Sequence, residues 1–121
     1  MTSTPKVLLV DDESEVRLLV RLMLDSCADV VGEAGDGAEA IAVYGAGEPP
    51  DVVILDLRMP DMDGLEVAAA MLEQEPEQQI VLFSSVITDE LRVRASALGI
   101  RACVNKEDFS ELPQLVIELT S

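Results

Sequence analysis

Histidine is absent from the 121-residue sequence, and cysteine is rare. Without an imidazole side chain, this chain has no histidine-dependent catalysis. The two cysteines, Cys27 and Cys103, lie far apart and lack the spacing of metal ligands. We therefore interpret both as reduced core residues and expect a cytoplasmic protein.

Basic residues are also scarce, because eight Lys and Arg stand against 24 Asp and Glu and give a formal net charge of -16. Nucleic-acid backbones and anionic membranes are bound by Lys and Arg, so we expect this chain alone to bind no nucleic acid and no membrane. No apolar run approaches the roughly 20 residues that span a bilayer, and no signal-peptide pattern precedes Val7. The charge favours cations and basic proteins as partners. The length predicts a single domain over 1–121 with one site.

Short apolar runs rich in β-branched residues alternate with amphipathic segments. The run 52–55 has no polar alternation, which is typical of a strand buried on both faces of a parallel sheet. We predict strands over 6–10, 29–33, 52–55, 80–83 and 100–104, each followed by a helix. The predicted N-caps of the second, fourth and fifth helices are Asp36, Thr88 and Ser110. Five strand–helix alternations predict an α/β fold with a parallel sheet covered on both faces.

Polar side chains follow the ends of four predicted strands: Asp11 with Asp12, Asp56, Ser84 and Lys106. The carboxyl ends of parallel strands meet at one edge of a sheet, where open α/β sheets bind ligands, so we expect these side chains to converge. Three crowded carboxylates repel one another and are stabilised by a hard divalent cation. Mg²⁺ suits one or two carboxylates together with phosphate and water. The pattern therefore predicts a Mg²⁺ and phosphate site.

Asp56 is the candidate nucleophile in this site. A carboxylate nucleophile that attacks a phosphoryl donor forms an acyl phosphate. The metal and the Lys106 ammonium would neutralise the transferring oxygens. The Ser84 hydroxyl would then donate a hydrogen bond to the bound phosphoryl group.

Each residue also has an ordinary structural explanation. An acid after a strand is commonly a helix cap, so Asp12 alone would more often cap the first helix than bind metal. A single Lys106 is usually a solvated surface charge, and a single Ser84 is usually a hydrogen-bonded hydroxyl. We interpret Asp61 and Asp63 as loop-solvating and turn residues. The convergence of the strand ends is what favours a site.

The chain resembles the response-regulator receiver domain family from end to end, through Asp11-Asp12, the run DLRMPDMDG over 56–64, Ser84 at the switch position and Lys106. The resemblance implies a flavodoxin-like (βα)5 doubly wound parallel sheet with strand order 2-1-3-4-5. It implies phosphoryl transfer to Asp56 from a phosphohistidine on a sensor histidine kinase or a phosphotransfer protein. It also implies Mg²⁺ held by Asp12, Asp56 and the Arg58 backbone carbonyl, with Asp11 assisting.

The sequence departs from the family pattern near Lys106. Glu107 follows the lysine where the family usually has proline, which resembles the branch whose receivers often precede a helix-turn-helix domain. Cys103 stands where the family often has Tyr or Phe. Because a cysteine side chain moves little volume when it rotates, we hypothesise that activation is carried by the backbone after Ser84 or by a change in association.

These features favour a phosphorylation-controlled signalling switch that is not an enzyme, although it assists its own phosphorylation and dephosphorylation. Its expected output is a downstream protein partner, or a homodimer. One alternative is the receiver part of a DNA-binding transcriptional regulator. Another is a Mg²⁺-dependent phosphohydrolase that uses Asp56 as nucleophile, but nothing in the sequence offers a substrate pocket or a dedicated general base. We expect output through the fourth helix, fifth strand and fifth helix, with Arg92, Arg94, Arg101 and Glu111.

Overall fold

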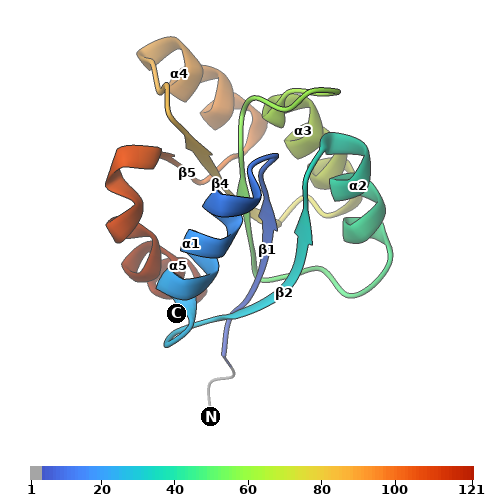
Figure 1. Ribbon diagram of the computed structural model, residues 1–121. Helices are drawn as coiled ribbons and strands as arrows, with labels where there is room; N and C mark the ends of the chain where they lie inside the picture. The colour runs from blue at the N-terminus through green and yellow to red at the C-terminus, as the bar shows by residue number, and fades with distance from the viewer. Residues whose placement is uncertain (1–3) are drawn as a thin grey trace.

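Five parallel strands form one sheet, as the strand–helix alternation predicts, in the order β2-β1-β3-β4-β5 that the family resemblance implies (Figure 1). The computed structural model describes residues 4–121. Among these residues, no helix is both long and apolar enough to cross a membrane. In chain order the elements are β1 (Lys6–Val10), α1 (Ser14–Leu24), β2 (Asp29–Ala34), α2 (Gly37–Gly45), β3 (Val52–Leu55), α3 (Gly64–Gln74), β4 (Gln79–Ser84), α4 (Asp89–Leu98), β5 (Ala102–Asn105), the 3-10 helix η1 (Lys106–Glu111) and α5 (Leu112–Thr120).

The alternation of side chains along the strands divides the core into two layers. In β1, Leu8 and Val10 pack on the face covered by α2, α3 and α4. Val7 and Leu9 point to the opposite face, which α1 and α5 cover (Figure 1). All four residues of the central strand β3 are buried. This double burial explains the unalternated apolar run and gives the strand ends a rigid base.

Two of the three predicted helix caps are confirmed. The Asp36 carboxylate accepts a hydrogen bond from Glu39 N at 2.8 Å, and the Thr88 hydroxyl accepts one from Leu91 N at 3.1 Å. Both bonds satisfy amide groups that have no partner inside their own helix. At the other end of α4, Gly99 adopts a left-handed conformation with a φ of 102°, which glycine tolerates without steric cost.

The third predicted cap is wrong, because Ser110 lies inside η1 and α5 begins only at Leu112. The Asn105 side chain accepts a hydrogen bond from Glu107 N at 2.9 Å and starts this 3-10 turn directly after β5. The last strand also begins later than expected, at Ala102. Ile100 N donates to Ala95 O at 3.0 Å, so Ile100 still belongs to the C-terminal turn of α4.

Candidate functional site

The backbone ladder aligns the two strand ends that carry buried carboxylates. Val10 pairs with Leu55 at the ends of β1 and β3, so the next residues, Asp11 and Asp56, lie side by side. Asp56 N donates to Val10 O at 2.8 Å, and Asp11 N donates to Ala34 O at 3.0 Å. Both residues are nearly inaccessible, with exposed fractions of 4% for Asp11 and 5% for Asp56. The backbone therefore holds both carboxylates in place.

Asp12 completes a group of three acids at this edge. Ligand oxygens of Asp11, Asp12 and Asp56 all lie within 4.8 Å of one another. Asp12 is exposed, whereas the other two carboxylates are buried. The group is therefore open to solvent on one side.

Lys106 is the cation of this cluster. Its Nζ lies 2.9 Å from Asp11 Oδ2 and 3.4 Å from Asp56 Oδ1, and more distantly 3.8 Å from the exposed Glu13. Among the described residues, this ammonium is the sole polar partner of the buried Asp11 Oδ2. Burial lowers the pKa of Lys106, but the hydrogen bonds and charges of Asp11 and Asp56 outweigh burial and raise it. The cluster thus contains one ammonium and three carboxylates, and it keeps an excess of negative charge.

The pKa of Asp56 reflects this excess. It is raised from 3.8 to about 6, first by burial and next by the charge of Asp11, while Lys106 partly opposes the rise. Burial disfavours a charged carboxylate, and a neighbouring like charge acts in the same direction. Asp56 is therefore mostly ionised at neutral pH, but its surroundings destabilise the ionised form.

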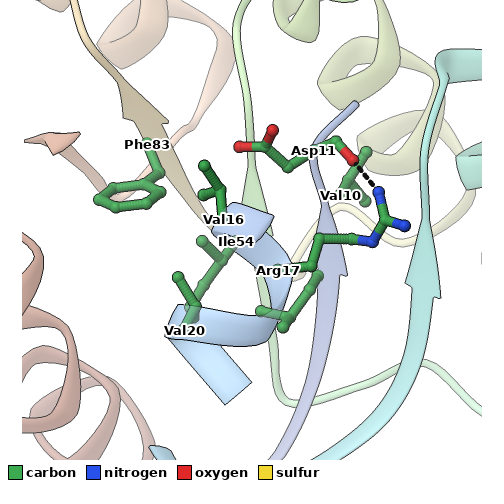
Figure 2. A pocket seen from close by; sticks show the side chains of 8 residues that line it. Val10, Asp11, Val16, Arg17, Val20, Ile54 and Phe83 are labelled. Carbon is green, nitrogen blue, oxygen red and sulfur yellow. Dashed lines mark hydrogen bonds between the residues drawn. The ribbon is translucent and has the colours of Figure 1, made fainter. Parts of the chain in front are cut away.

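A second layer of charged residues fixes the backbone beneath the cluster. In Figure 2, Arg17 extends from α1 and donates to the carbonyl oxygen of Asp11. The Arg17 Nε also contacts Glu33 Oε1 at 3.1 Å, and Arg21 binds the other oxygen of Glu33. These contacts hold the pKa of Glu33 below its usual value, with the Arg21 hydrogen bond as the largest cause. No local sequence pattern signals this group, because only the pairing of β2 with β1 brings Glu33 beside α1.

Ser84 reaches the expected edge of the sheet, but its hydroxyl is used locally. It is the last residue of β4 and is 2% exposed. Its Oγ accepts a hydrogen bond from Val86 N at 3.3 Å and lies 3.4 Å from Val86 O. The hydroxyl therefore contacts the start of the β4–α4 loop and no carboxylate of the cluster.

The loop after Asp56 returns very close to the strand that it leaves. Gly64 N donates to Leu57 O at 2.7 Å, and Arg58 pairs with Asp63 across the base of the loop. A Cβ atom at Gly64 would lie 2.3 Å from the carbonyl oxygen of Asp56, so glycine alone permits this approach. Arg58 thus lies at the base of a closed loop, two residues after Asp56.

Asp61 and Asp63, interpreted as loop-solvating and turn residues, both cap helices, so the solvating role is wrong for Asp61. Asp63 forms a reciprocal capping box with Glu66 at the start of α3. Asp61 accepts hydrogen bonds from Gly37 N and Ala38 N, both at 2.9 Å, and so caps the distant helix α2. The spacing of Asp63 and Glu66 signals a capping box in the sequence, whereas no local pattern signals a cap 24 residues away.

Comparisons with known proteins identify the family. Residues 7–117 match the model of the response regulator receiver domain. The chain belongs to this family. It is 40% identical over 104 residues to the DNA-binding transcriptional activator DevR/DosR of Mycobacterium tuberculosis, with 84% of this chain and 48% of the relative covered. It is 34% identical over 102 residues to the chemotaxis protein CheY of Listeria monocytogenes, with 84% and 85% covered.

Solved receiver structures agree with this assignment. The signal receiver domain of the putative response regulator NarL from M. tuberculosis superposes with a TM-score of 0.89 at 32% identity, and 98% of each chain is covered. The chain spans about half the length of DevR/DosR but most of CheY. The expected flavodoxin-like fold and receiver family are therefore both confirmed.

The residues present fit the magnesium ion that receiver domains bind at an acidic pocket. All the donors in the cluster are oxygens, which is the chemistry that Mg²⁺ prefers. The buried Asp11 Oδ2 has one ammonium as its polar partner, and the raised pKa of Asp56 reports uncompensated negative charge. A divalent cation would give the Asp11 carboxylate a further partner and would neutralise the negative charge around Asp56.

We predict that Asp56→Asn stabilises the metal-free protein at neutral pH. Because the pKa of Asp56 is raised, the folded state binds a proton more readily than the unfolded chain, and stability falls as pH rises from about 4 to about 6. The shift corresponds to at most about 3 kcal/mol at pH 7. Urea unfolding with a chelator should show the variant more stable at pH 7, with the difference shrinking below about pH 4.

Asp25→Asn provides the control, because Asp25 is an exposed acid at the end of α1. It should show no comparable gain. Equal stability of Asp56→Asn and wild type at pH 7 would contradict the excess negative charge assigned to the cluster.

Proposed function

We propose that residues 1–121 act as one phospho-accepting receiver domain, in which Asp56 takes the phosphoryl group from a sensor histidine kinase or a phosphotransfer protein. The observation that carries this proposal is the juxtaposition of three carboxylates within 4.8 Å with the Lys106 ammonium. A buried carboxylate beside a fixed cation is suited to attack a phosphorus centre and to hold the product.

The reaction converts a phosphohistidine into an acyl phosphate. An Asp56 carboxylate oxygen attacks the phosphorus, the bond from phosphorus to the donor imidazole nitrogen breaks, and that nitrogen takes the electron pair and then a proton. Asp56 must be ionised to attack, and its pKa of about 6 leaves it so at pH 7. Because the Asp56 side chain is only 6% exposed, little water has to leave it before it attacks.

Mg²⁺ would be held by Asp12, Asp56 and the Arg58 carbonyl with help from Asp11, and when bound it supplies positive charge for the phosphoryl oxygens. Lys106 supplies the protein's own positive charge at the same place, since its Nζ is already 3.4 Å from Asp56. No described residue offers a histidine or a dedicated general base for turnover of an external substrate. The domain is therefore a phospho-acceptor that assists its own phosphorylation and dephosphorylation.

Ser84 is the proposed switch. Its bond with Val86 ties the hydroxyl to the β4–α4 loop before phosphorylation. A phosphoryl group on Asp56 offers stronger acceptors, and a Ser84 hydroxyl that turns toward it must release the Val86 backbone. Cys103 is half-buried and packs at the margin of the core, and its small side chain adds little movement of its own.

The proposed output is a cytoplasmic protein partner, or a second copy of the domain, that binds the face formed by α4, β5 and α5. This face adjoins both Ser84 and Lys106, and it carries Arg92 and Arg94 of α4, which are exposed. Arg101, just before β5, and Glu111, at the end of η1, are also exposed at its edge. DevR/DosR is a DNA-binding activator of twice the matched length. A DNA-binding output domain in the same polypeptide is therefore the second form of this proposal, since the charge of -16 disfavours DNA binding by the receiver alone.

We predict that acetyl phosphate and Mg²⁺ add one phosphoryl group to this protein, at Asp56. Mass spectrometry of the intact protein should detect this group in wild type and in the control Asp25→Asn. It should detect none in Asp56→Asn, and none in wild type with excess chelator. Labelling of Asp56→Asn at the wild-type level would remove the proposal. Steady turnover of small phosphate esters would instead favour a phosphohydrolase.

The switch is tested by comparing Ser84→Ala with Cys103→Ala. Phosphorylation should shift the amide resonances of Val86 and Ile87 in wild type and in Cys103→Ala, but much less in Ser84→Ala, because only the last variant lacks the hydroxyl. A Cys103→Ala protein that folds and accepts phosphate normally but loses the response would show that Cys103 is itself a switch element.

A further inference from the structure

The loop between β3 and α3 has a second anchor outside its own hairpin base. Its base is closed by the bond from Gly64 N to Leu57 O and by the pairing of Arg58 with Asp63. From the tip of the loop, both carboxylate oxygens of Asp61 reach α2, where Gly37 N and Ala38 N each donate at 2.9 Å. The tip is therefore tied to a helix that begins 24 residues earlier in the chain.

The amides that Asp61 binds are ones that α2 cannot satisfy itself. The first four N–H groups of a helix lack partners within it. Asp36 serves the third, Glu39 N, through its carboxylate at 2.8 Å. Ala40 N makes the first regular bond of the helix, to Asp36 O at 3.0 Å. Asp61 serves the first two, and these bonds hold its pKa below the usual value, that from Gly37 being the largest cause. The caps of α2 are thus divided between a local residue and the site loop.

Side-chain packing reinforces the same contact. A Cβ atom at Gly37 would lie 2.8 Å from Met62 Cβ and 2.9 Å from Met62 Sδ. The absence of a side chain at Gly37, which is buried, is what lets Met62 lie against the start of α2. We call the contacts of Asp61 and Met62 with Gly37 and Ala38 the loop clamp.

The loop clamp connects the two sides of the acidic cluster. On one side, the loop carries Arg58, three residues before Asp61 and two after Asp56. On the other, the strand leading to α2 ends at Ala34, whose carbonyl accepts a hydrogen bond from Asp11 N at 3.0 Å. A displacement of the loop tip from α2 would change the position of Arg58 relative to Asp11 and Asp56.

We propose that Asp61 is a positioning residue that sets the Mg²⁺ affinity of the cluster by holding the Arg58 carbonyl in place. The inference rests on the proposed function only in taking that carbonyl as a metal ligand. Asp61 is itself engaged with α2 through both oxygens and is not a ligand. Removal of a residue that orients a metal ligand without binding the metal itself typically changes metal affinity about tenfold or more.

The test uses three variants and Mg²⁺ alone. Asp61→Ala removes both bonds, Asp61→Asn keeps one acceptor oxygen, and Asp36→Ala removes a cap of the same helix that does not touch the loop. Titration followed by backbone amide resonances should show Mg²⁺ affinity about tenfold weaker in Asp61→Ala and within about threefold of wild type in Asp61→Asn. Asp36→Ala should bind Mg²⁺ like wild type.

Hydrogen exchange of the metal-free proteins gives an independent measurement. Loop amides over 58–62 should exchange faster in Asp61→Ala and not in Asp36→Ala, because only the former frees the loop. Wild-type Mg²⁺ affinity in Asp61→Ala, or an equal loss in Asp36→Ala, would overturn the inference while leaving Asp56 phosphorylation intact. A wild-type protein that binds no Mg²⁺ would overturn the proposed function as well.

Discussion

The mutual repulsion of three carboxylates beside a single ammonium is the constraint on which this receiver domain depends. Ligand oxygens of Asp11, Asp12 and Asp56 lie within 4.8 Å, and Lys106 reaches two of these acids from the end of β5. Such a group would separate in a flexible chain, because one ammonium compensates the repulsion of three carboxylates only in part. The three carboxylates stay together only because a rigid backbone frame holds them, and an added cation or phosphoryl group changes the charge balance at that fixed position.

The frame comes from burial of the central strands. Because β1, β3 and β4 are covered on both faces, their carboxyl ends cannot move independently, and ladder bonds continue to Asp11 N and Asp56 N. The parts that respond to chemistry lie just outside this frame. They are the Ser84–Val86 turn, held by the bonds between Ser84 Oγ and Val86, and the loop that carries Arg58. That loop is held by the contacts at its base and by the bonds of Asp61 to α2. Asp56 thus lies at the end of a strand buried on both faces, whereas the proposed switch and the Arg58 loop lie at the margin of the core.

Most of the fold and the positions of the acids could be predicted from the sequence, because both follow from strand periodicity and the geometry of parallel sheets. Ser110 was assigned wrongly, since a 3-10 turn and a helix cap share the same local residues. Asp61 was missed for a different reason. Its partners, Gly37 and Ala38, become neighbours only after the sheet has formed, and tertiary caps leave no spacing in the sequence. The local bond of Ser84 is likewise set by loop geometry.

A crystal structure of the protein with Mg²⁺ and beryllofluoride, a mimic of a phosphoryl group on aspartate, tests the central claim most directly. We predict Mg²⁺ bound by Asp12, Asp56 and the Arg58 carbonyl at about 2.0–2.1 Å. Lys106 Nζ and Ser84 Oγ should both contact the fluoride atoms at Asp56, and Ser84 should have left Val86. The account would be contradicted by a metal bound elsewhere, or by a beryllofluoride complex in which Lys106 and Ser84 keep the contacts described above.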